Sequence, residues 1–171
     1  MNKKTNLVLI GMPASGKSTV GVILAKVTGR NFIDADIVIQ NKTGKKLSEI
    51  IEEEGVDGFV EVENRINSAI EAENSVISTG GSAVYGKEEM EHFKENGIIV
   101  YLKVGFEDLT VRLGNIKERG VVVKEGQTLR DIYDERVPLY EKYADHTIDE
   151  SGKNVEDIVS EIEKEVMTKY F

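Results

Sequence analysis

The sequence predicts an α/β fold in which a five-stranded parallel sheet lies between helices. Short apolar runs of β type alternate along the chain with helical segments, which is the pattern of parallel strands joined by helical crossovers. The first apolar run, residues 7–10, leads directly into a glycine-rich turn and then a helical segment. With 171 residues, the chain has the length of one domain whose core needs neither disulfides nor structural metals, so we expect a single domain over residues 1–171.

Each expected element follows from its local pattern. Strands are expected where short apolar runs end at turn residues, at 7–10, 31–33, 75–78, 98–103 and 147–148. Helices are expected where apolar residues recur at helical spacing, at 17–27, 47–53, 59–73, 87–96, 106–113, 129–143 and 155–168. Thr128 followed by Asp131 is typical of the capped start of a helix. Tyr133, Tyr140 and Tyr143 share roughly helical spacing and are expected to pack that helix against the sheet.

Composition excludes several classes of function. The chain has no cysteine, which excludes thiol redox chemistry and thiolate metal sites. A net charge of -9 argues against a broad nucleic-acid surface. No segment approaches the roughly twenty apolar residues of a membrane span. We expect a cytoplasmic monomer that binds neither nucleic acid nor membrane.

Residues 11–19, which read GMPASGKST, are typical of a loop that binds nucleotide phosphates. Two glycines that bracket four residues let successive backbone N–H groups surround an anion. Lys17 can reach the β- and γ-phosphates, and Ser18 can offer its hydroxyl to Mg²⁺. The helix that begins at Lys17 adds the positive end of its dipole. We expect Lys17 on an exposed loop without core contacts; the alternative is a glycine-rich surface turn.

Asp34 and Asp36 come directly after the expected strand 31–33. On an extended chain, alternation points both carboxylates to one side at the carboxyl end of the strand, where open α/β sheets bind ligands. One carboxylate could then serve Mg²⁺ and the other the nucleophile of phosphoryl transfer. The alternative is that these carboxylates cap the next helix.

A third motif, Thr79-Gly80-Gly81-Ser82, follows the expected strand 75–78. Glycines at this place allow backbone N–H groups to approach a bound molecule closely. The alternative is a plain turn.

Taken in order, these motifs resemble the shikimate kinases, which are small ATP-dependent enzymes with the P-loop fold of the nucleoside-monophosphate-kinase type. The resemblance covers GMPASGKST, FIDAD, Thr43-Gly44 opening the next helix, TGGSAV, and RVPLY at residues 136–140. It implies a three-layer α/β/α P-loop kinase with a substrate-binding region over about 34–62 and a mobile lid over about 114–126. It also implies ATP and Mg²⁺ as cofactors and a small hydroxylated molecule as the acceptor.

The resemblance further implies a role for each matched residue. Lys17, Asp36 and Arg119 would be catalytic: Asp36 would hold and deprotonate the acceptor hydroxyl, and Arg119 would be the lid arginine. Ser18 and Asp34 would hold the metal. The acceptor would contact Asp36, Gly80, Gly81, Ser82 and Arg136, of which Arg136 would bind a substrate carboxylate. The nucleotide would contact Gly11, Ala14, Ser15, Gly16, Lys17, Ser18, Thr19 and Arg112. Arg112 would stack on adenine, and a helix-surface ion pair is the alternative for it.

Three departures from the family lie on the acceptor side. Val60 stands where an arginine usually joins the late arginine on the substrate carboxylate, Ser82 replaces a third glycine, and Gly120 replaces a proline. Losing one arm of such a clamp costs about 1.5–3 kcal/mol of binding. Arg65 lies five residues further on and is expected to face another side of the helix.

We therefore expect an enzyme that transfers the γ-phosphate of ATP to shikimate, giving shikimate 3-phosphate. One alternative is a kinase of the same fold that acts on a different small hydroxylated metabolite. The other is a nucleotide-binding sensor domain without turnover, although mere binding requires neither the paired aspartates nor a lid arginine.

Overall fold

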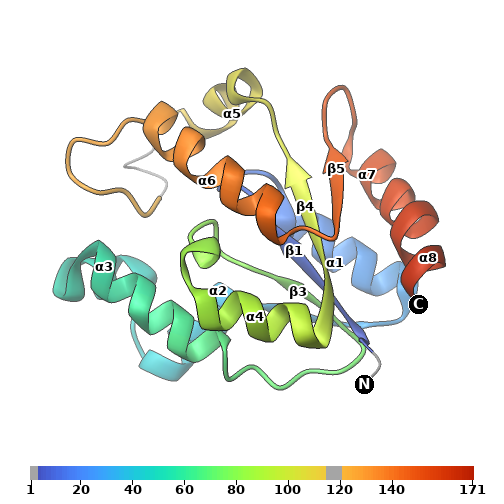
Figure 1. Cartoon of the computed structure of the whole chain (residues 1–171), viewed down its shortest axis with the longest axis horizontal. Coiled ribbons are helices and arrows are strands. Elements are labelled where there is room, and N and C mark those ends of the chain that lie inside the picture. Colours follow the sequence, from blue (N-terminus) through green and yellow to red (C-terminus); the bar gives the residue numbers. More distant parts are fainter. Residues whose placement is uncertain (1–3, 115–120) are drawn as a thin grey trace.

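The computed structural model describes residues 4–114 and 121–171, which contain a five-stranded parallel sheet (Figure 1). The strand order is β2-β3-β1-β4-β5, and every neighbouring pair is parallel. The strands are β1 Asn6–Ile10, β2 Asn31–Asp34, β3 Ser75–Ser78, β4 Gly97–Lys103 and β5 His146–Asp149. All five expected strands are present, and no strand end differs from its expected position by more than one residue.

The helices are α1 Lys17–Thr28, α2 Ala35–Thr43, α3 Leu47–Asn67, α4 Lys87–Asn96, α5 Phe106–Leu113, α6 Leu129–Tyr143, α7 Val155–Ile162 and α8 Thr168–Tyr170. A 3₁₀ turn, η1 Ala83–Tyr85, follows β3, and a π-helical segment, η2 Glu163–Met167, joins α7 to α8. The cap expected before α6 is present, because the Thr128 side chain accepts a hydrogen bond from the Asp131 backbone and the reverse bond is also made. No helix within residues 4–114 and 121–171 has the combined length and apolarity that crossing a bilayer requires.

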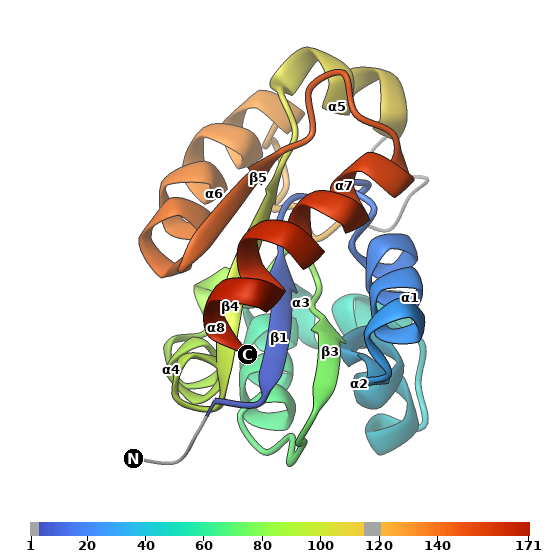
Figure 2. The ribbon, with the colours of Figure 1, turned by 90° about the vertical axis from the view of Figure 1, so that its right-hand side faces the viewer.

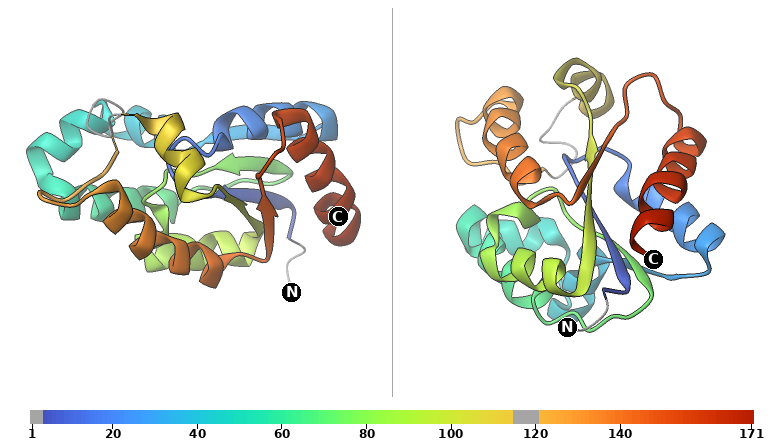
Figure 3. Two further views of the ribbon diagram at one scale, coloured as in Figure 1. Left: turned by 90° about the horizontal axis from the view of Figure 1, so that it is seen from above. Right: turned by 45° about the vertical axis from the view of Figure 1, so that its right-hand side comes forward.

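Helices lie on both faces of the sheet, so the expected three-layer α/β/α architecture is confirmed (Figures 2 and 3). In β1, side chains alternate between the faces, as an extended chain requires. Leu7 and Leu9 belong to one buried cluster with residues of α1 and α7. Val8 and Ile10 belong to another with residues of α4, α5 and α6. The sheet is therefore buried on both sides, which is typical of parallel sheets.

Two parts of the chain between β2 and β3 differ from the expectation. Residues 35–43 form helix α2, because the Asp34 side chain caps it by accepting from the N–H groups of Asp36 and Ile37. Thr43-Gly44 ends this helix and does not open the next: Gly44 adopts φ 68° and its N–H donates to the Gln40 carbonyl.

Helix α3 contains the helices expected at 47–53 and 59–73, and Gly55, with φ 74° and ψ 177°, interrupts the helical conformation between them, as expected. Helix α3 ends at Asn67, six residues before the expected end. Helices α2 and α3 pack together through a third buried cluster of Ile39, Ile50, Phe59 and Ile66. The helix expected at 155–168 changes from α to π hydrogen bonding after Ile162.

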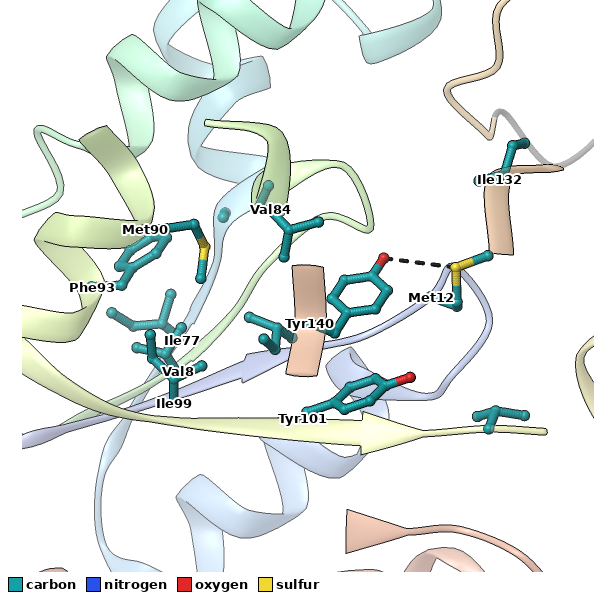
Figure 4. Packing of buried hydrophobic residues seen from close by; sticks show 14 of the residues in the cluster. Val8, Met12, Ile77, Val84, Met90, Phe93, Ile99, Tyr101, Ile132 and Tyr140 are labelled. Atoms are coloured by element: carbon teal, nitrogen blue, oxygen red, sulfur yellow. Dashed lines mark hydrogen bonds between the residues drawn. The ribbon is translucent and has the colours of Figure 1, made fainter. Parts of the chain in front are cut away.

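Tyr140 of α6 lies between the core and the loops that follow the carboxyl ends of β1 and β3 (Figure 4). It is fully buried and stacks on Tyr101 of β4 with ring centroids 5.1 Å apart, as the expected packing of this helix on the sheet requires. Its hydroxyl donates to the Gly81 carbonyl at 2.5 Å and lies 3.8 Å from the Met12 sulfur. One side chain thus holds the loop after β1 and the turn after β3 at a common place.

Candidate active site

The loop between β1 and α1 has the backbone shape of an anion site. Ala14 adopts φ 63° and Gly16 adopts φ 81°, so two residues of this short loop are left-handed. A non-glycine residue holds that conformation only where its surroundings enforce it. Gly16 is the N-cap of α1 and offers no side chain to cap it. The first N–H groups of α1 can therefore donate to a phosphate, as the sequence predicts.

Lys17 lies deeper than expected. Its side-chain ammonium donates to the carbonyls of Gly11 and Met12, both at 2.8 Å, and to the Ser15 hydroxyl at 3.3 Å. The residue is only 7% exposed, so the expectation of an exposed lysine without buried contacts is wrong. Burial lowers the pKa of Lys17 to about 8, although the carboxylate of Asp36 opposes the shift. A partly desolvated ammonium that bonds only to neutral oxygens is suited to receive an anion.

Ser18 and Asp34 meet next to this loop. The Ser18 hydroxyl donates to Asp34 Oδ2 at 2.9 Å and lies 3.3 Å from the Ser78 hydroxyl. Asp34 uses its other oxygen, Oδ1, to cap α2. The alternative for this carboxylate, a helix cap, is therefore present, and it leaves Oδ2 facing Ser18. Hydroxyl and carboxylate oxygens are the donors that Mg²⁺ prefers, and this ion usually takes few of them from the protein and the rest from water and phosphate. The described residues contain no cluster of three or more carboxylate or imidazole ligands, and such a site does not need one.

Asp36 is not on an extended chain. It lies in the first turn of α2, so strand alternation does not orient it, and that expectation is wrong. The helix nevertheless directs the carboxylate into the same cavity that Lys17 lines. Burial raises the pKa of Asp36, the negative charge of Asp34 adds to the shift, and Lys17 opposes it.

The glycine turn after β3 lies against both loops. A Cβ at Gly81 would be 2.6 Å from the Pro13 ring, and a Cβ at Gly80 would be 2.8 Å from Asp36 Oδ1. The packing of this turn against its neighbours therefore requires glycine at both positions. Ser82 also lines the cavity, and its hydroxyl donates to a buried carboxylate at 2.8 Å.

That carboxylate belongs to Glu63 of α3, a residue that the sequence reasoning missed. Glu63 is completely buried, its Oε1 accepts from Ser82, and its Oε2 has no partner among the described residues. The same Oε2 lies 2.9 Å from the position that a Gly80 Cβ would take. Burial raises the pKa of Glu63 to about 7. A signal was present, because Phe59, Glu63 and Ile66 share helical spacing on the buried face of α3.

Arg136 of α6 closes the other side of the site. It is 1% exposed; its Nε donates to the Tyr85 hydroxyl at 3.2 Å and its Nη2 to the Val122 carbonyl at 2.7 Å. A cavity of about 340 Å³ lies between Arg136, Lys17 and Asp36. Its remaining lining residues are Pro13, Ala14, Gly16, Ser18, Thr19, Leu47, Phe59, Thr79, Gly80, Gly81, Ser82, Val121 and Val122. The structure thus brings residues of three separate motifs and of α6 around one space.

The predicted residues outside this cavity have other surroundings. Arg112 Nη1 donates to Glu150 Oε2 at 2.8 Å and to the Ala14 carbonyl at 3.3 Å, so it forms the ion pair considered as its alternative while lying beside the phosphate-binding loop. Arg65 lines a different cavity together with Lys42, in agreement with its expected orientation. Arg119 and Gly120 lie outside the described residues.

The chain is similar to known proteins over most of its length. A family model described as shikimate kinase matches residues 13–167. The shikimate kinase of Haemophilus influenzae strain PittEE is 37% identical over 166 residues, which cover 95% of this chain and 92% of that protein. The shikimate kinase of Pasteurella multocida strain Pm70 is 39% identical over 152 residues, or 86% and 87% of the two chains.

Solved structures give the same result. The structure of shikimate kinase from Acinetobacter baumannii in complex with shikimate aligns with a TM-score of 0.85 and 33% identity, and the alignment covers 98% of this chain and 96% of that one. The shikimate kinase from Aquifex aeolicus vf5 aligns with a TM-score of 0.77 and 32% identity over 92% of this chain and 94% of that one.

Proposed function

Because the chain belongs to the shikimate kinase family, we propose that it uses ATP to phosphorylate a hydroxyl group of shikimate, giving shikimate 3-phosphate. The observation that carries the proposal is the shared cavity of Lys17, Asp36 and Arg136. Phosphoryl transfer requires a held phosphate chain, a held acceptor hydroxyl and a group that takes the hydroxyl proton. The cavity contains residues suited to each of these tasks.

On the nucleotide side, the N–H groups at the start of α1 would bind phosphate oxygens. Lys17 would exchange its bonds to the Gly11 and Met12 carbonyls for bonds to the β- and γ-phosphates. Ser18 and Asp34 would hold Mg²⁺, whose preference for oxygen donors they fit. When bound, this ion neutralises charge on the phosphate oxygens.

On the acceptor side, Asp36 would take the proton of the attacking hydroxyl. The hydroxyl oxygen forms a bond to the γ-phosphorus while the bond from that phosphorus to the bridging oxygen breaks, and ADP keeps the electron pair. Burial raises the pKa of Asp36 and so makes it a stronger base than an exposed carboxylate. Gly80 and Gly81 would allow the acceptor to approach the backbone, and Arg136 would bind the acceptor carboxylate.

Release of ADP, coupled to a spectroscopic readout, tests this proposal with and without shikimate. We expect release that depends on shikimate and that Asp36→Asn lowers by about 100-fold or more. Asp134→Asn is the matched control, because Asp134 is an exposed aspartate that only pairs with Arg130 on the surface of α6. Equal activity of the Asp36 variant and the control would contradict the assignment of Asp36.

Val60 gives a specific reason to test other acceptors, because valine cannot pair with a carboxylate. ADP release with another hydroxylated acid but not with shikimate would assign the chain to a different acceptor. The absence of ADP release with every acceptor tested would indicate a nucleotide-binding domain without turnover. A monomeric, cytoplasmic enzyme also remains part of the proposal, and sedimentation and cell fractionation test those two points.

A further inference from the structure

A second cavity of about 150 Å³ adjoins the first, and Arg136 and Val122 line both. Its other lining residues are Val56, Asp57, Val60, Tyr85, Lys124, Gln127 and Glu135. Helix α3 thus contributes valine side chains to this space. The positive charges among its described lining residues come from Arg136 and Lys124.

Arg136 has a buried nitrogen that could bind an anion, and the described residues do not supply one. Its two hydrogen bonds with the described residues go to a tyrosine hydroxyl and a backbone carbonyl, which carry no charge. Its third nitrogen, Nη1, is buried and has no partner among the described residues. A buried guanidinium without an anionic partner is costly, so a bound carboxylate in this place would be strongly favoured.

The acidic side chains of the second cavity already have partners. Glu135 accepts from the Tyr85 hydroxyl at 2.5 Å and from the Gln127 amide at 3.4 Å. Asp57 pairs with Lys124 at 3.4 Å, and the two side chains are 86% and 60% exposed. An ion pair this exposed stabilises the fold very little. Lys124 can therefore leave Asp57 for a better-placed carboxylate at small cost.

The backbone around Lys124 is held by hydrogen bonds beside the second cavity. The Val122 carbonyl accepts from Arg136, so the cation of the first cavity anchors the chain two residues before Lys124. The Lys124 N–H donates to the Gln127 side chain at 3.1 Å, and the Gln127 N–H donates to the Lys124 carbonyl at 3.1 Å. These two bonds close a small turn that fixes the backbone from which the lysine side chain extends.

We propose that Lys124 determines acceptor specificity by binding the acceptor carboxylate together with Arg136. The inference rests on the proposed function and assigns to Lys124 the charge that α3, with Val60, does not provide. A carboxylate between the two cations would satisfy Arg136 Nη1 and would lie over the apolar surface of Val60 and Val122. The hydroxyl groups of the same molecule would extend into the first cavity toward Asp36.

Steady-state kinetics of Lys124→Met test this inference. Methionine keeps an unbranched apolar stem, one atom shorter than the lysine side chain, and removes the charge. We expect the KM for shikimate to rise about fivefold or more, while the KM for ATP and kcat stay within twofold. With the methyl ester of shikimate, which lacks the carboxylate charge, wild type and variant should have the same KM.

Two matched variants separate binding from structure. Lys87→Met removes a lysine of α4 that is also exposed and surface-paired and lies outside both cavities, and it should change nothing. Asp57→Asn breaks the same ion pair from the other side and should leave the KM for shikimate unchanged or lower it. An unchanged KM in Lys124→Met, or an equal rise in Asp57→Asn, would overturn the inference. If wild type shows no ADP release with shikimate, the proposed function fails and this inference fails with it, which is a distinct result.

Discussion

Glu63 is a buried acid whose ionisation should make the stability of this protein depend on pH. The side chain is completely inaccessible, and burial raises its pKa from 4.5 to about 7. A shift of this size corresponds to about 3 kcal/mol. Because the pKa of Glu63 is higher in the folded state, its contribution to the free energy of unfolding is fully present below the unfolded pKa of 4.5. This contribution is lost as the pH rises through the folded pKa of about 7. The charged and titratable groups that face Glu63 are Asp36 on α2, Arg136 on α6, Lys17 on α1 and Glu89 on α4.

Replacing Glu63 by glutamine should remove this loss. Glutamine keeps an oxygen for the Ser82 hydroxyl and cannot ionise. We expect the free energy of unfolding of Glu63→Gln, relative to wild type, to rise by up to about 3 kcal/mol between pH 5 and pH 8. Urea unfolding followed by circular dichroism at both pH values measures this difference.

Glu61→Gln is the control for this experiment. Glu61 lies two residues away on the same helix and is exposed, so its replacement should leave the difference between pH 5 and pH 8 unchanged. The reasoning would be refuted if Glu63→Gln followed the wild-type pH dependence, or if its relative stability fell as the pH rose.

Three further predictions concern the cavity directly. Gly80→Ala should lower activity at least about tenfold, because its Cβ would press on Asp36 and on the buried Glu63; Gly105→Ala, with open space around its Cβ, should be harmless in the same kinetic and thermal-melting measurements. Affinity for ATP, measured by calorimetry, should weaken as the pH rises through about 8, because Lys17 loses its proton there and must regain it to bind phosphate; a constant affinity from pH 7 to 9 would contradict this. Val60→Arg should lower the KM for shikimate about tenfold, because it adds a guanidinium to the cavity that Arg136 already lines, and an unchanged or higher KM would point to another acceptor.

The features that the sequence predicted correctly depend on residues close together along the chain. The apolar run of β1, the glycine spacing of residues 11–19 and the Thr128 cap each act within one or two turns of backbone. Strand alternation and helical spacing are also local, and they were sufficient for the five parallel strands, the three layers and most helix ends. Helix α2 was not predicted. An aspartate after a strand is compatible both with continued extension and with the cap of a new helix, so the residues around Asp34 do not distinguish the two.

The resemblance carried the prediction of the acceptor side, and local pattern alone could not have placed it. Asp36 was expected beside Asp34 on a strand, yet it reaches the cavity from a helix. Glu63 looks like its exposed neighbour Glu61 until α3 is packed against the turn of Ser82. Lys17 was expected to be exposed, because its burial depends on the loop folding back around its ammonium group.

The amino-acid sequence by itself determined the succession of strands and helices, the phosphate-binding loop and the side chains available for chemistry, because backbone preference and periodic burial act over a few residues. The tertiary structure alone decided which of those side chains share a space. Met12, Gly81 and Tyr140 meet although up to 128 positions separate them along the chain. Such meetings result from the packing of whole helices on the sheet, which buries Glu63 and Arg136 beside the cavity, and no short stretch of sequence encodes that packing.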